Sequence, residues 1–252
     1  MTGNLNSLTT ALGIFAIILV GIFFGVWLGQ RLPTSHLSRA SQDTIIIAIG
    51  MVAAMTSLVL GLLTAEVKSS FDAADQEIKA QGARLEQMNL TSREIDNPSV
   101  AAVRQSLAEL SRLAVAETFE DAGRSDRSRV IYVATYRTIM DMPAPTVLEQ
   151  QVKADLHDEL LDVAQHHLAV IQATNGTIPL PFLYMMVAWT AMIFMSWAIF
   201  APRNATVIAI FVICAASVSG ALFLILEMDT PFDGLIAISS EPLQNAITAL
   251  TY

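Results

Sequence analysis

The sequence predicts an all-α, polytopic membrane protein, in which four transmembrane helices carry a helical polar domain inserted between the second and third. Only 15% of the 252 residues are charged, whereas soluble domains contain about 25%. Of the 37 charged residues, 29 lie between Glu66 and Asp162. Uncharged apolar runs fill the flanks, at 11–29, 44–65, 181–201 and 205–226. At about 1.5 Å per residue, each run can cross a hydrocarbon layer of roughly 30 Å as a helix.

These patterns divide the chain into four expected segments. Residues 1–65 would hold the first two transmembrane helices, and 66–176 a helical extramembrane domain. Residues 177–227 would hold the third and fourth transmembrane helices. Residues 228–252 would form a turn at the membrane surface and an amphipathic C-terminal helix, which could lie on the membrane or on the helical domain.

Small residues recur on the first two predicted transmembrane helices. Glycines four residues apart let another helix approach closely. The first helix has such a stripe at Gly21, Gly25 and Gly29, and the second has Gly50, Ala54, Ser57 and Gly61. Packing within one subunit and contact between subunits would both use such stripes, so the pattern leaves these alternatives open.

The polar region has the periodicity of a helical bundle. The second helix is expected to run on through residues 64–87, because this stretch contains good helix formers and no proline. Thr146 and Glu149 form a capping box that would open another helix, which reaches about residue 174. Two apolar stripes follow the helical period: Val100, Val103, Leu107, Leu110 and Ala114, then Leu148, Val152, Leu156, Leu160, Val163 and His167. With a short apolar helix at 130–140, four amphipathic helices could share one core.

One polar helical face could hold a metal ion. Asp158, Asp162 and His166 stand four residues apart, and carboxylates with imidazole suit a divalent cation. One helix supplies only one side of a coordination shell, however, and acidic residues on a polar face are commonly just solvated. Metal binding is therefore the weaker interpretation, and no cofactor is expected.

Other functions lack their sequence signatures. No catalytic motif is present, so we do not expect an enzyme. The formal net charge is −9, with no basic face for a nucleic-acid partner. The four apolar runs contain no charged residue, whereas a pump or an ion-coupled transporter normally keeps one within the membrane. This absence favours a passive pore or a structural protein.

Two stretches of the chain resemble a known family. Residues 60–72 close the second span, and residues 224–234 with 236–243 follow the fourth. Together with Pro202, Arg203 and Asn204, they resemble the bacterial bestrophin-like domain membrane proteins. In this resemblance Asp229, Pro231, Phe232 and Gly234 form the family's motif turn. That family is in turn similar to the bestrophins, although the Arg-Trp-Trp step that follows the second span of bestrophins is missing here.

The resemblance implies a homo-oligomeric channel. Bestrophins are pentameric chloride-type anion channels whose second helix lines an apolar neck. By that resemblance the pore would be lined by Leu60, Leu63, Thr64, Val67 and Phe71, and its apolar rings would gate by dewetting. The partners would be further copies of the chain, the lipid bilayer and small inorganic ions. The alternative is a non-conducting membrane scaffold or sensor built on the helical bundle.

The expected location is the bacterial inner membrane, as a multi-pass protein. Arg31, Arg39 and Arg203 lie in the short loops and would place the polar domain outside. Lys68, Lys79 and the similarity to bestrophins favour the cytoplasmic side. We expect the cytoplasmic orientation.

Overall fold

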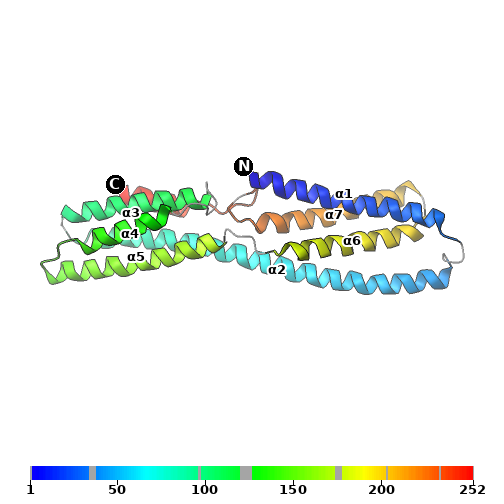
Figure 1. The fold of residues 1–252 in the computed structure, drawn as a ribbon, viewed down its shortest axis with the longest axis horizontal. Helices are drawn as coiled ribbons and strands as arrows, with labels where there is room; N and C mark the ends of the chain where they lie inside the picture. Colours follow the sequence, from blue (N-terminus) through cyan, green and yellow to red (C-terminus); the bar gives the residue numbers. More distant parts are fainter. Residues whose placement is uncertain are drawn as a thin grey trace. The chain divides into compact units, whose positions relative to one another are not determined.

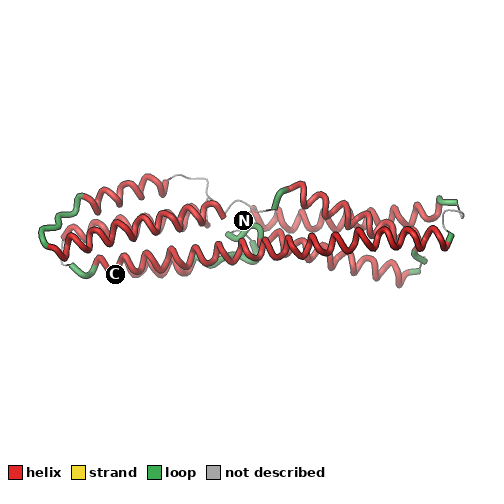
Figure 2. The backbone as a smooth tube through the Cα atoms, turned by 90° about the horizontal axis from the view of Figure 1, so that it is seen from below, coloured by secondary structure: helices red, strands yellow, loops and turns green. Residues whose placement is uncertain are grey.

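The computed structural model describes residues 2–33, 38–95, 98–119, 127–173, 178–202, 204–232 and 234–251. In these ranges the chain is helical and contains no strand (Figure 2). Arg203 and the chain breaks expected at 123–126 and 175–177 lie outside the described residues. The first four helices are α1 (Thr2–Arg31), α2 (Arg39–Ser92), α3 (Pro98–Phe119) and α4 (Arg127–Met140). The others are α5 (Val147–Ala173), α6 (Leu180–Phe200), α7 (Ala205–Met228) and α8 (Glu241–Thr251) (Figure 1).

The chain forms two compact units. The first, here the membrane unit, comprises Met1–Ser69 and Gly176–Asp229. The second, here the bundle unit, comprises Ser70–Asn175 and Thr230–Tyr252. Helix α2 continues without interruption from one unit into the other. Four described helices are long and apolar enough to cross a membrane, namely α1, α2, α6 and α7, so the protein is a membrane protein.

Helix α1 is central to the membrane unit, where it packs against α6 and α7 (Figure 1). Its buried face carries Ile14, Ile18 and Ile22, which meet apolar side chains of the neighbouring helices. A Cβ atom added at Gly25 would lie only 2.3 Å from the Met195 carbonyl oxygen, and one added at Gly29 would lie 2.4 Å from that of Ile199. The contact is looser at Gly21, where an added Cβ atom would lie 3.1 Å from the Ala191 carbonyl oxygen. The first glycine stripe therefore packs within one subunit.

The bundle unit has its own apolar core, to which α2, α3, α4, α5 and α8 all contribute. Every residue of the predicted α3 stripe is buried. The α5 stripe is buried from Val152 onward, whereas Leu148 is 53% exposed. Leu148 lies in the first turn of α5, inside the capping box, where the Thr146 hydroxyl accepts a hydrogen bond from Glu149 N at 3.2 Å.

The C-terminal helix packs into this bundle. Leu243, Ala246 and Leu250 of α8 are buried, and the carbonyl of Ala249 accepts a hydrogen bond of 2.9 Å from the Asn89 amide. A Cβ atom at Gly82 of α2 would lie 2.9 Å from the Pro242 carbonyl oxygen. Of the two placements that the sequence left open for the tail, the structure has the one on the bundle.

The close approach of α1 and α6 can be tested with Gly25→Ala. The added methyl group has no room against the Met195 carbonyl, so the two helices must separate. We expect a loss of about 1–3 kcal/mol in the free energy of unfolding, measured in detergent. Gly13→Ala is the matched control, because a Cβ atom there meets nothing within 4 Å. Equal unfolding midpoints for the two variants would contradict the proposed close contact.

Candidate functional site

Helix α2 is the most exposed transmembrane helix within a single subunit. Only 6% of its apolar membrane-spanning stretch is buried, whereas 22% to 39% of the corresponding stretch is buried in each of the other three helices. One face, which includes Thr56 and Val67, is buried, and Leu60 and Leu63 pack partly against the same core. The remaining circumference of the helix is open.

The open surface of α2 has two different faces. Large apolar side chains occupy one face, each at least 60% exposed: Met51, Met55, Leu58 and Leu62. Small residues occupy the other, here the small-residue face: Gly50, Ala54, Ser57, Gly61 and Thr64. All five are exposed in the subunit, and a Cβ atom added at Gly50 or Gly61 would meet nothing within 4 Å. Unlike the glycines of α1, Gly50 and Gly61 are therefore not explained by packing against the part of the chain that the structure describes.

The five residues expected to line a pore fall into different environments. Thr64 is exposed on the small-residue face, and its hydroxyl donates a 2.7 Å hydrogen bond to the Leu60 carbonyl. Val67 is only 1% exposed, in the core of the membrane unit that Leu60 and Leu63 flank. Phe71 belongs to the bundle unit, where it packs against the core of the bundle. The apolar periodicity of the sequence therefore identified the face of α2 that packs against its own subunit. Core residues and a hydrophobic pore wall have the same periodic pattern, so the sequence did not distinguish them.

The motif turn follows α7. The Asp229 carboxylate accepts a 3.1 Å hydrogen bond from Ile178 N, just before α6. The Pro231 carbonyl accepts one of 2.8 Å from Ile238 N. Gly234 has φ 138°, a backbone conformation that residues with a side chain rarely adopt. Phe232 lies in the turn that was expected at the membrane surface, but it is 8% exposed and contacts Phe119 edge-on at 5.5 Å in the bundle core.

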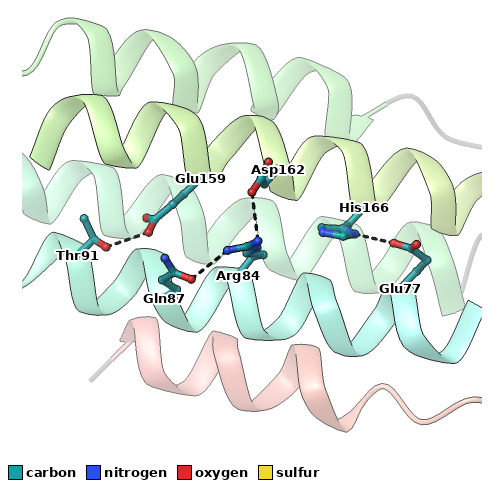
Figure 3. Close-up of polar contacts among 7 residues, drawn as sticks. All are labelled: Glu77, Arg84, Gln87, Thr91, Glu159, Asp162 and His166. Carbon is teal, nitrogen blue, oxygen red and sulfur yellow. Dashed lines mark hydrogen bonds and ion pairs between the residues drawn. The ribbon is translucent and has the colours of Figure 1, made fainter. Parts of the chain in front are cut away.

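A ladder of polar contacts joins α2 to α5 (Figure 3). His166 Nδ1 lies 2.6 Å from the Glu77 carboxylate, and the Arg84 guanidinium lies 3.5 Å from that of Asp162. The Thr91 hydroxyl donates a 3.1 Å hydrogen bond to Glu159. Burial raises the pKa of Glu159, and the hydrogen bond from Thr91 opposes that shift.

Two of the candidate metal ligands, Asp162 and His166, take part in this ladder. Asp162 faces a guanidinium, which is incompatible with a cation at the same carboxylate, and His166 contacts Glu77. Asp158 is exposed beside them. Among the described residues there is no group of three His, Cys, Asp or Glu side chains that could hold a metal ion. The polar face of α5 therefore makes its contacts with α2.

A second polar cluster lies inside the bundle. His167 and Glu117 have side chains only 2% and 1% exposed, and their facing Nε2 and Oε2 atoms are 3.6 Å apart. Gln81 Nε2 lies 3.5 Å from His167 Nδ1, and the Tyr132 and His167 rings are 5.7 Å apart. Helices α2, α3, α4 and α5 thus each contribute one member: Gln81, Glu117, Tyr132 and His167.

Three members of this cluster, Gln81, Glu117 and Tyr132, were not identified from the sequence. Glu117 follows Ala114 by three residues, so it continues the apolar stripe of α3, and Gln81 lies between the buried Ile78 and Leu85. The signal in the sequence was a polar residue at a position where the helical spacing predicts a buried apolar one. Burial lowers the pKa of His167 although Glu117 opposes the shift, so the imidazole is neutral at pH 7. Burial also raises the pKa of the Tyr132 hydroxyl.

The buried histidine makes the stability of the bundle depend on pH. Its folded-state pKa lies below the unfolded value of 6.5, so the folded state loses stability as the pH falls below 6.5. We expect His167→Gln to reduce the fall in unfolding temperature between about pH 7.5 and about pH 5.5. His166→Gln, on the partly exposed ladder, should leave that fall unchanged. An equal pH dependence in the wild type and His167→Gln would contradict this assignment.

The comparisons with known proteins agree with this architecture. The Bestrophin-like domain family matches residues 16–243. Two crystal structures of single-substitution variants of a bacterial Bestrophin homolog from Klebsiella pneumoniae have similar folds. One has a TM-score of 0.69 at 12% identity and covers 97% of both chains. The other has a TM-score of 0.67 at 10% identity and covers 94% of this chain and 97% of that chain.

A third crystal structure, of a membrane protein, has a TM-score of 0.62 at 13% identity, covering 94% of this chain and 97% of that chain. Identities this low indicate a shared fold and nothing further. No curated protein matches the chain in sequence. Because the family match extends over most of its length, the chain belongs to the Bestrophin-like family.

Proposed function

We propose that the chain forms a homo-oligomeric, pentameric membrane channel whose pore is lined by the small-residue face of α2. The observation that carries this proposal is the exposed stripe of Gly50, Ala54, Ser57, Gly61 and Thr64, which none of the described residues of its own subunit covers. Lipid tails would meet the large side chains on the other open face. In a ring, the small-residue face would turn toward the axis, where short side chains leave space for ions.

The pore wall in this proposal has packed support behind it. Leu60, Leu63 and Val67 pack α2 against its own subunit, and Thr64 is the one member of the expected set that lies on the proposed pore face. Phe71 anchors the continuing helix in the bundle unit. The family's Bestrophin-like character agrees with a channel and gives no reason to expect an enzyme.

Anions are the proposed cargo. No charged residue occurs on α2 between Thr44 and Ala65, so the pore wall would contain no carboxylate ring. Four residues after Thr64, on the same helical face, comes Lys68, which is exposed. A positive side chain at this position would concentrate chloride at the mouth of the pore.

Ion flux from liposomes tests the channel. We expect chloride efflux through the wild type, and a reduction of about tenfold for Gly61→Leu, because a large side chain would fill the pore. Leu62→Ala, on the lipid-facing side of the same turn, should conduct like the wild type. Sodium efflux measured in parallel reports selectivity. Background flux from a correctly assembled wild-type ring would contradict the channel and leave the non-conducting scaffold.

We further propose that the protein resides in the bacterial inner membrane with the bundle unit in the cytoplasm. Gln105 is exposed on α3 and offers a labelling position within the bundle unit. In a Cys214→Ser background, Gln105→Cys should react with a membrane-impermeant maleimide only after the cells are lysed. Labelling in intact cells would place the bundle on the outside.

A further inference from the structure

Two helices of the bundle unit expose apolar side chains to solvent. Helix α4 presents Val130 at 70% exposure and Val133 at 47%, followed by the exposed Arg137. Helix α5 presents Leu161 at 46% and Leu168 at 59%, preceded by the exposed Asp155 and Asp158. Apolar patches of this kind on an extramembrane bundle commonly mark an interaction surface.

The two faces are opposite in charge. On α4 the exposed apolar side chains lie with Arg129 and Arg137, which help to line a shallow depression on that helix. On α5 the exposed Asp158 lies about one turn before Leu161, and the one lysine of the helix, Lys153, is directed to the carbonyls of Met140 and Met142. The α4 face is therefore basic and the α5 face acidic.

The two faces also match in level along the bundle. Within one chain the rings of Tyr136 and His157 are 5.3 Å apart, and the Tyr132 hydroxyl donates a 3.2 Å hydrogen bond to the Val163 carbonyl. These contacts fix the antiparallel register of α4 and α5. In this register Arg137 lies near the level of Asp158, and Val133 lies near the level of Leu161.

We propose that the exposed face of α4 in one subunit docks on the exposed face of α5 in the next subunit of the ring. In this proposal the axis of the ring is parallel to the bundle helices. Rotation about such an axis leaves each residue at the same height, so residues at equal heights meet between neighbouring subunits. Arg137 then pairs with Asp158 of the next copy, and Val133 with Leu161. Such a head-to-tail contact uses two different surfaces of each chain, which is the condition for a closed ring. This inference rests on the homo-oligomer of the proposed function and assigns its extramembrane interface.

Disulfide cross-linking tests the pairing. In a Cys214→Ser background, Val133→Cys combined with Leu161→Cys should give a ladder of covalent oligomers on oxidation. Each single-cysteine variant should run as a monomer on the gel. When the two single-cysteine variants are co-expressed, the largest covalent species should be a dimer, because each chain has only one cysteine. Gln105→Cys with Leu161→Cys is the mismatched control, because Gln105 lies on α3. Cross-linking confined to single chains, or no cross-linking, in protein of oligomeric native mass would overturn the interface.

A charge exchange separates this inference from the channel proposal. Arg137→Asp and Asp158→Arg should each lower the oligomeric fraction about tenfold, and the double variant should restore it. An unchanged oligomer for both single variants would overturn the interface while leaving the conducting ring intact. A monomeric wild type without ion flux would instead overturn the proposed function.

Discussion

The continuity of α2 is the constraint on which both units depend. The helix runs for 54 residues, from Arg39 to Ser92, or about 80 Å at 1.5 Å per residue. No proline interrupts it, so its backbone hydrogen bonds continue from the apolar segment into the polar one. Val67 is buried in the core of the membrane unit, and Ala74, two turns later, is buried in that of the bundle. Residues in the core of the membrane unit and residues in the core of the bundle unit thus belong to a single helix.

The two glycine stripes illustrate one sequence pattern with two physical outcomes. On α1 the glycines let α6 approach until backbone carbonyls occupy the space where side chains would lie. On α2 the corresponding positions face away from the chain. A free helix face of small residues is poorly suited to lipid, which packs better against the methionines and leucines beside it. This asymmetry around α2 is the physical basis for placing a pore there.

Much of the fold could be predicted from the sequence, because it depends on hydrophobicity and period. The four apolar helices, the α3 stripe and the capping box at Thr146 all follow from local patterns. The side of α2 that packs could not be identified, because a core face and a hydrophobic pore face have the same periodicity. Charged residues had the same ambiguity: Asp162 and His166 resembled metal ligands until their partners on α2, Arg84 and Glu77, were known.

The central claim is that α2 turns its small-residue face toward the axis of a ring of identical subunits. A cryo-EM map of the purified protein in nanodiscs measures this most directly. The account predicts a closed ring with a central opening along the membrane segment, with Gly50, Ser57 and Gly61 of every copy at its wall. A ring whose axis is lined by α1 or α6, or a particle in which lipid covers the small-residue face of α2, would contradict it.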